Sequence, residues 1–177
     1  MNKQTNIRKL TLSAVFLALA YVLPFLTGQI QQIGAMLAPM HIPILLCGFV
    51  CGSPWGAVAG FIAPLLRSVT VGMPPIFPKG IAMAFELATY GFVAGLMYRI
   101  FPKKRGYTYL ALLIAMVSGR LVWGAVRFIC TGLDTSAFGI AAFWAGAVTN
   151  AIPGIILQII LVPLLVTLIN KSNFTDK

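Results

Sequence analysis

Long apolar segments bounded by clusters of basic residues are the feature that most restricts the folds open to this chain. The clusters lie at Lys3–Lys9, Arg99–Arg105 and Lys171–Lys177, beside apolar segments close to the roughly 17–25 residues that a bilayer-crossing helix needs. Hydrophobic residues make up 59% of the chain and charged residues 9%, whereas about a quarter of the residues in soluble domains are charged. The sequence therefore predicts an all-α, multi-pass membrane protein.

Six apolar segments fit the chain as transmembrane helices. Basic loops face the cytoplasm in most membrane proteins, and only an even number of spans puts all three basic clusters on that side. We therefore expect a single integral membrane domain, residues 1–177, built as a bundle of six transmembrane helices with both termini cytoplasmic. The expected location is a bacterial plasma membrane. The predicted spans are Leu10–Thr27, His41–Gly52, Trp55–Thr70, Gly80–Ile100, Tyr107–Thr131 and Ile140–Ile169.

Several functional classes do not fit this sequence. The net charge is +10, but the cations form no continuous basic stripe, so no nucleic-acid partner is expected. Leu10–Leu26 is too long for the apolar part of a signal peptide, and no A-x-A-type site follows it. Cys47 and Cys51 are expected as small apolar core residues. One His and one intramembrane acid cannot assemble a metalloprotease motif or a catalytic triad, and no P-loop is present. We expect neither an enzyme nor a resident cofactor or metal, and any ATP hydrolysis would need another chain.

Four cations stand apart from the basic clusters. Arg67, Lys79, Arg120 and Arg127 fall toward the opposite ends of the spans, and His41 heads the second span on the same side. A charge within the membrane is costly unless it is compensated, and an uncompensated guanidinium calls for an anion or strong acceptors. We therefore expect a net positive cavity near the outer face that favours an anionic or oxygen-rich solute. The loops predicted on that side are Gln29–Met40, Val71–Lys79 and Gly132–Gly139.

Glu86 is the one acidic residue within a predicted span. It could neutralise Arg120 or Arg127, accept hydrogen bonds from a ligand, or do both. Trp123 and Trp144 either pack and anchor the helices or stack on a ligand. Helical spacing predicts three shared faces, Lys79-Met83-Glu86-Tyr90, Met116-Arg120-Trp123-Arg127-Cys130 and Trp144-Ala147-Asn150/Ala151-Gly154-Gln158. The predicted substrate-binding residues are Arg67, Lys79, Glu86, Tyr90, Arg120, Trp123, Arg127, Trp144, Asn150 and His41.

Small residues recur at four-residue spacing on several spans. Ala14 and Ala18 lie on the first span, and glycines continue the spacing through the second and third spans and on the fourth. Such ridges let helix backbones approach closely in a membrane. Packing within the bundle and contact with another protein both remain open. The glycines are Gly48, Gly52, Gly56, Gly60, Gly91 and Gly95.

Four segments together resemble a known family. They are LTLSAVFLA (residues 10–18), HIPILLCGFVCG (41–52), PWGAVAG (54–60) and NAIPG (150–154). With the six predicted spans and the basic tails, they are similar to the substrate-specific (S) components of energy-coupling factor (ECF) transporters, small membrane proteins that capture vitamins and related micronutrients. The resemblance covers nearly the whole chain.

The resemblance implies a bundle whose ligand lies near the outer face, enclosed by outer loops and the last three helices. It implies as partners a transmembrane coupling subunit, contacted by the ridge at Ala14 and Ala18, and two ATP-binding subunits. It also implies that Asn150 meets the ligand. Transport in the family is thought to involve toppling of the S component in the membrane.

The substrate stays open at this stage. Pantothenate would suit a positive cavity through its carboxylate, and the charge count favours it slightly. A 7-deazapurine of the queuosine type would instead use Glu86. A stand-alone secondary transporter or channel with proton coupling through Glu86 or His41 is an alternative, and so is a membrane protein of structural role without a ligand.

Overall fold

The computed structural model describes residues 3–27, 37–102, 104–132, 139–147 and 149–171, and these are helical almost throughout. The predicted loops Gln29–Met40 and Gly132–Gly139 lie largely outside the described residues. In chain order the elements are α1 (Lys3–Val22), η1 (Leu23–Thr27), α3 (His41–Cys51), α4 (Ser53–Val71), η2 (Ile76–Gly80), α5 (Ile81–Ile100), α6 (Arg105–Cys130), α7 (Ile140–Ala147), η3 (Thr149–Ala151) and α8 (Ile152–Lys171).

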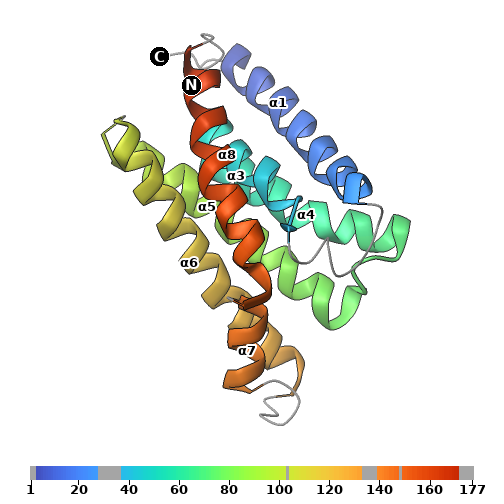
Figure 1. The fold of residues 1–177 in the computed structure, drawn as a ribbon. Helices are drawn as coiled ribbons and strands as arrows, with labels where there is room; N and C mark the ends of the chain where they lie inside the picture. Colours follow the sequence, from blue (N-terminus) through green and yellow to red (C-terminus); the bar gives the residue numbers. More distant parts are fainter. Residues whose placement is uncertain (1–2, 28–36, 103, 133–138, 148, 172–177) are drawn as a thin grey trace.

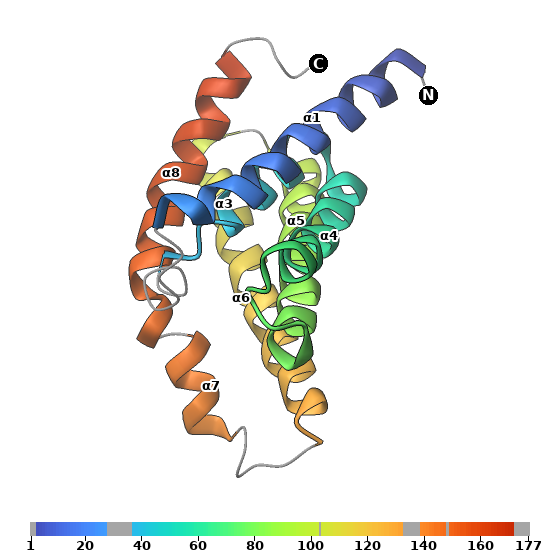
Figure 2. The ribbon, with the colours of Figure 1, turned by 90° about the vertical axis from the view of Figure 1, so that its right-hand side faces the viewer.

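The helices run back and forth between two ends of one bundle. The first turn of α1, the α5–α6 connection and the last turn of α8 lie at the same end (Figure 1; Figure 2), and we call it the basic end because it carries the basic clusters. α1, α4 and α6 run away from this end, whereas α3, α5 and α8 run toward it. The common location of the three basic clusters agrees with an even number of crossings.

Five described helical segments are long and apolar enough to cross a membrane, namely Asn6–Leu26, Ser53–Val71, Ile76–Ile100, Gly106–Cys130 and Ile152–Lys171. The predicted span His41–Gly52 corresponds to the short helix α3. With 11 residues, α3 is about 16 Å long, roughly half of a bilayer core. Ten of its residues are buried. It therefore starts inside the bundle rather than at its surface, which departs from the expected position of His41 at an outer mouth.

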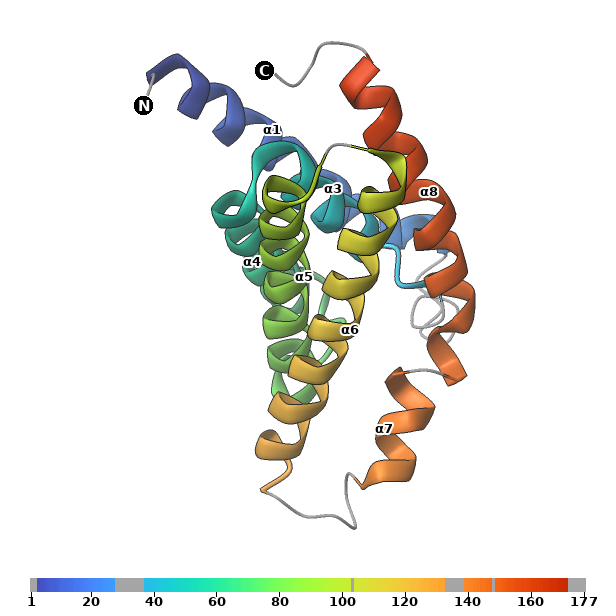
Figure 3. The ribbon, with the colours of Figure 1, turned by 90° about the vertical axis from the view of Figure 1, so that its left-hand side faces the viewer.

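The predicted continuous span Ile140–Ile169 is wrong, because the structure divides it into α7, η3 and α8. Figure 3 shows α7 and α8 as separate helices along one side of α6. Pro153 is the second residue of α8. A proline there lacks an N–H and its ring clashes with the carbonyl four residues earlier, so a helix begins readily at this point but does not pass through it.

Glycines pack α3, α4 and α5 backbone to backbone. A Cβ added at Gly91 would fall against the carbonyl of Gly56, and one added at Gly48 or Gly56 would fall against the carbonyl of Gly91. Contact of this kind is available to glycine alone, and it lets helices associate closely without a hydrophobic driving force. These glycines therefore serve packing within the bundle, which was one of the two interpretations of the small-residue spacing.

Candidate functional site

Glu86 is the centre of a buried polar group contributed by three helices. Its Oε1 atom lies 2.9 Å from Nη1 of Arg120 on α6 and 3.4 Å from Nε2 of His41, the first residue of α3. The Tyr90 hydroxyl interacts with the same carboxylate, and the His41 and Tyr90 rings meet edge to face with centroids 5.2 Å apart. Glu86 and Tyr90 are each 1% exposed. Of the two partners expected for Glu86, Arg120 and Arg127, the structure places Arg120 in contact with it.

This group lies at mid-depth in the bundle. Tyr90 is the tenth residue of the twenty-residue helix α5, and α3 begins beside it at His41. The first backbone N–H groups of a helix have no partner within the helix and carry the positive end of its dipole. The N-terminus of this half-length helix therefore lies inside the bundle, where the side chain of His41 reaches Glu86, and membrane transporters use helices interrupted in this way in their binding sites.

Several buried polar atoms in this region have no hydrogen-bond partner among the described residues. They include both ring nitrogens of His41, Oε1 of Glu86 and Nε of Arg120. Oε1 of Glu86 and Nε2 of His41 nevertheless lie within ion-pair distance of a partner, so, within the described segments, the buried atoms left without one include Nδ1 of His41, Nε of Arg120 and Oε1 of Gln158. Most buried polar side-chain atoms in proteins have at least one hydrogen-bond partner. A group with this many unsatisfied donors and acceptors is suited to bind a polar solute.

Gln158 of α8 is a further buried polar residue of the bundle. Nδ2 of Asn170 donates to the Tyr98 hydroxyl at 2.6 Å, which joins α8 to α5 near the basic end. Gln158 precedes Asn170 by twelve residues, and Glu86 precedes Tyr98 by twelve residues. At about 1.5 Å per residue, each lies about 18 Å from that contact.

The side chain of Gln158 points into the bundle. It is 1% exposed, and its Oε1 atom has no hydrogen-bond partner in the described part of the chain. It lies on the buried face of α8, and α8 packs against α3 and α6. Gln158 was on a predicted helical face but not among the predicted binding residues. A glutamine within an apolar span is the signal that could have identified it.

Arg67 is in contact with the end of α1 and is not brought to the Glu86 group. Its Nη1 atom donates to the carbonyl of Tyr21 at 3.1 Å, and its guanidinium carbon lies 4.9 Å from the centroid of the Phe25 ring. The last carbonyls of a helix have no partner within the helix and carry its negative end, so a cation is stabilised there. The buried charge of Arg67 thus has a structural partner.

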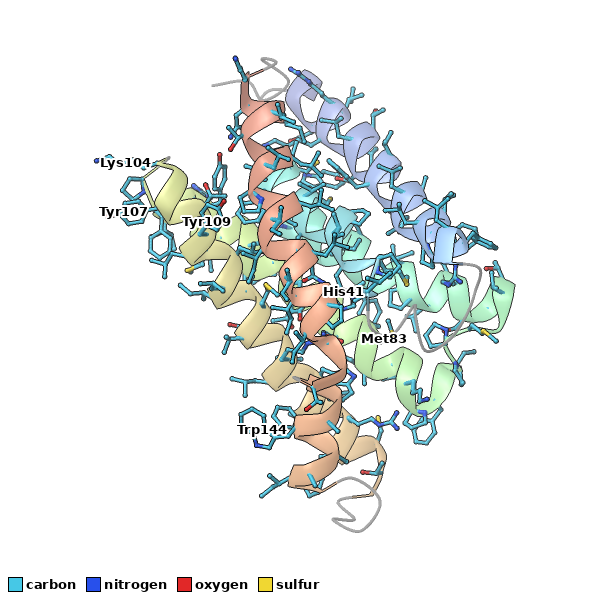
Figure 4. All side chains as sticks on the ribbon, viewed as in Figure 1. His41, Met83, Lys104, Tyr107, Tyr109 and Trp144 are labelled. Carbon is cyan, nitrogen blue, oxygen red and sulfur yellow. The ribbon has the colours of Figure 1, made fainter. Side chains whose placement is uncertain are left out.

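Lys79 and Trp144 are both exposed. Lys79 lies in the π-helical turn η2, seven residues before Glu86, which is about 10 Å along the helix direction. Trp144 is 58% exposed on α7, and Figure 4 shows it directed away from the bundle, whereas His41 lies at the centre. The structure therefore does not bring either residue to the Glu86 group.

The predicted inward face of α6 is confirmed. Met116 is buried and Arg120, Trp123 and Arg127 are partly buried, whereas exposed residues occupy the other side of the helix. The Trp123 ring lies 6.3 Å from that of Phe143 on α7, so it takes part in α6–α7 packing. Arg127 lies seven residues beyond Arg120, about 10 Å farther from the basic end. The side chain of Asn150 lies outside the described residues.

The two alanines of the α1 ridge point away from the bundle. Ala14 and Ala18 are exposed, whereas Ser13, Phe16 and Ala20 of the same helix are buried. Among the residues that the structure describes, the ridge is therefore not used for packing, in contrast to the glycines of α3, α4 and α5.

Comparison with known families agrees with this arrangement. Residues 8–166 match the model of the family described as ECF transporter, substrate-specific component. No significant match was found among curated proteins or among solved structures. The family match covers most of the chain and confirms the resemblance drawn from the sequence segments. The chain belongs to the family of substrate-specific components of ECF transporters.

Proposed function

We propose that this S component captures a small polar solute at the group formed by Glu86, Arg120, His41 and Gln158. The family supports a substrate-binding subunit of an ECF transporter. The observation that carries the site is the set of buried polar atoms on four helices that lack hydrogen-bond partners among the described residues. A solute that supplied those partners would gain affinity from each hydrogen bond, about 1 kcal/mol for neutral groups and more for charged ones.

The other predicted site residues keep a role in this proposal. Arg127 lies beyond Arg120 on α6 and would contact the part of the solute nearer the far end of the bundle. Tyr90 would help to hold the Glu86 carboxylate in position. Asn150, Lys79, Trp123, Trp144 and Arg67 stay predictions from the sequence, and the positions of the last four favour support or entry over direct contact.

The proposed partners are a transmembrane coupling subunit and two ATP-binding subunits, which S components use for transport. We propose that the coupling subunit contacts Ala14 and Ala18. Their exposure supports this, because a pair of small residues one helical turn apart and facing away from the bundle leaves room for a partner helix. The termini would be cytoplasmic, and vitamins and related micronutrients, among them pantothenate and 7-deazapurines of the queuosine type, are the candidate solutes.

A stand-alone proton-coupled transporter is the second candidate, favoured by the buried contact of 3.4 Å between His41 and Glu86. Expression with and without an ATPase module separates the two. Solute uptake by the ECF importer requires the ATP-binding subunits, and a Walker A lysine mutation in them should abolish it. Uptake that persists in that mutant and responds to an imposed pH gradient would contradict the importer.

A further inference from the structure

We propose that the corner where α5 turns into α6, at the basic end of the bundle, binds the headgroup of an anionic phospholipid, with an acyl chain of that lipid along the outer face of α6. We call this surface the α5–α6 corner and define it by four exposed residues. The proposal concerns the lipid around the protein and is independent of the solute that the protein captures. The four residues are Arg99, Lys104, Tyr107 and Tyr109.

A ring contact holds the two helix ends of this corner together. The ring of Phe101, the residue directly after α5, lies 5.8 Å from the ring of Tyr107 in the first turn of α6, measured between centroids. Between them, the backbone N–H of Lys104 donates to the carbonyl of Pro102 at 2.7 Å, and the N–H of Tyr107 donates to the carbonyl of Lys104 at 3.0 Å. Arg99 directly precedes the last residue of α5. The short turn therefore keeps the two exposed cations at one corner.

No acidic residue of the described segments neutralises the positive charge of this corner. Residues 99–105 contain four cations and no acid. The chain has three acidic residues, and Glu86, the one that lies within the described residues, is buried in the bundle beside Arg120. Arg99 and Lys104 are exposed, and each exposed cation near a membrane surface strengthens binding to anionic headgroups by about fivefold. An anionic partner is therefore favoured.

Exposed tyrosines lie beside the cations of the corner. Tyr107 is 39% exposed and Tyr109 is 43% exposed, and Figure 4 shows both near Lys104 at the beginning of α6. Tyrosine is enriched at the membrane–water interface, where its ring packs against lipid and its hydroxyl reaches polar groups. The combination of exposed tyrosines with exposed cations therefore favours a lipid over a soluble anion.

An exposed apolar stripe continues from the corner along α6. Four leucine and valine residues recur at three- and four-residue intervals and therefore share one helical face. They are 43–61% exposed. The stripe is about 17 Å long, close to the depth of one leaflet of a bilayer core that is about 30 Å thick. A basic headgroup site joined to an apolar stripe of this length matches the shape of a phospholipid. The four residues are Leu110, Leu113, Val117 and Leu121.

Lipid titration of the purified full-length protein tests the proposal by native mass spectrometry. Phosphatidylglycerol and phosphatidylcholine with identical acyl chains are added to the delipidated protein in detergent, and the fraction of protein that carries a lipid gives the affinity. We expect phosphatidylglycerol to bind about tenfold more tightly than phosphatidylcholine. The double variant Arg99→Gln/Lys104→Gln should weaken phosphatidylglycerol binding by about tenfold and leave phosphatidylcholine binding unchanged.

Lys79→Gln is the matched control, because it removes an exposed cation from the η2 turn, away from the basic end. It should leave the affinity for phosphatidylglycerol unchanged. Thermal unfolding in detergent establishes that each variant is folded before its binding is compared. If the double variant does not fold, Lys104→Gln alone serves as the test, with an expected loss of about fivefold.

The headgroup without its chains, glycerophosphoglycerol, separates a lipid from a soluble phosphate compound. We expect it not to displace phosphatidylglycerol at equal concentration, and displacement would assign the corner to soluble phosphates and overturn the proposal. Equal binding of the two lipids, or an unchanged affinity in the folded variants of the corner, would also overturn it. A loss of the same size in Lys79→Gln would show a general effect of net charge and would overturn the assignment to this corner.

Discussion

At the scale of single residues, the buried carboxylate of Glu86 is the centre of the polar contacts inside the bundle. It is buried, paired with Arg120 and close to His41, so removing one partner leaves the other charge in an environment that cannot solvate it. Breaking a buried ion pair costs about 3–5 kcal/mol, whereas replacing both partners is often nearly neutral. This asymmetry provides a test of the pair that is independent of any ligand.

We predict that Arg120→Gln and Glu86→Gln each lower the thermal stability of the ligand-free protein, by about 3–5 kcal/mol in free energy of unfolding. The double substitution should recover most of that loss, because two neutral amides can hydrogen-bond to each other. Thermal unfolding of the four proteins in detergent forms the double-mutant cycle. Additive losses would contradict the pairing.

Arg67 gives a contrasting prediction at the same scale. Arg67→Gln should lower stability by about 1–3 kcal/mol, because it removes a charged hydrogen bond to the carbonyl of Tyr21 and the contact with Phe25. Solute affinity, measured at a temperature where the variant is folded, should stay unchanged. A large loss of affinity at normal stability would instead support the original prediction that Arg67 contacts the solute.

At the scale of elements, small residues have two different uses in this fold. The glycines of α3, α4 and α5 bring three backbones together and leave no room for a Cβ. The alanines of α1 face outward, on a helix whose buried residues include Ser13, Phe16 and Ala20. The helices packed by glycine hold His41 against Glu86, and α1 presents Ala14 and Ala18 on its exposed side.

Larger residues on the α1 ridge should therefore affect assembly and spare the site. We expect Ala14→Leu and Ala18→Leu to leave solute affinity and stability of the isolated protein unchanged, while recovery of the complex with the coupling subunit and uptake in cells both fall. Val15→Leu, at another exposed position of the same helix, is the matched control. Loss of solute binding by the isolated Ala14 or Ala18 variant would count against the docking role.

At the scale of the whole molecule, the polar group and the basic residues lie at different levels of the bundle. The basic clusters lie at one end, the polar group lies at mid-depth, and α7 with the η2 turn lies toward the far end (Figure 1). If the basic end is cytoplasmic, a solute would enter from the far end and meet Arg127 before it reaches Arg120 and Glu86.

This orientation is tested by labelling single cysteines in a chain whose three native cysteines, at positions 47, 51 and 130, are replaced by alanine. We expect Lys79→Cys to react with a membrane-impermeant maleimide in intact cells. Lys104→Cys and Lys171→Cys should react only after the cells are permeabilised. The reverse pattern would invert the proposed orientation, and labelling of all three in intact cells would contradict the shared location of the basic clusters.

The sequence by itself determined the properties that depend on one helix at a time. Apolar length predicted the long apolar helices, basic residues predicted which ends lie together, and helical spacing predicted the inward face of α6 that includes Arg120. These follow from local periodicity and from the cost of charge in a membrane, and both can be calculated along the chain.

Only the tertiary structure decided which polar residues meet. Arg67 and Arg120 are similar in the sequence, but one contacts the end of α1 and the other pairs with Glu86. Gln158 was buried by the packing of α8 against α3 and α6, and the short α3 brought His41 to mid-depth. Partner choice depends on how helices cross and where each begins, and a single-helix pattern contains no information on either.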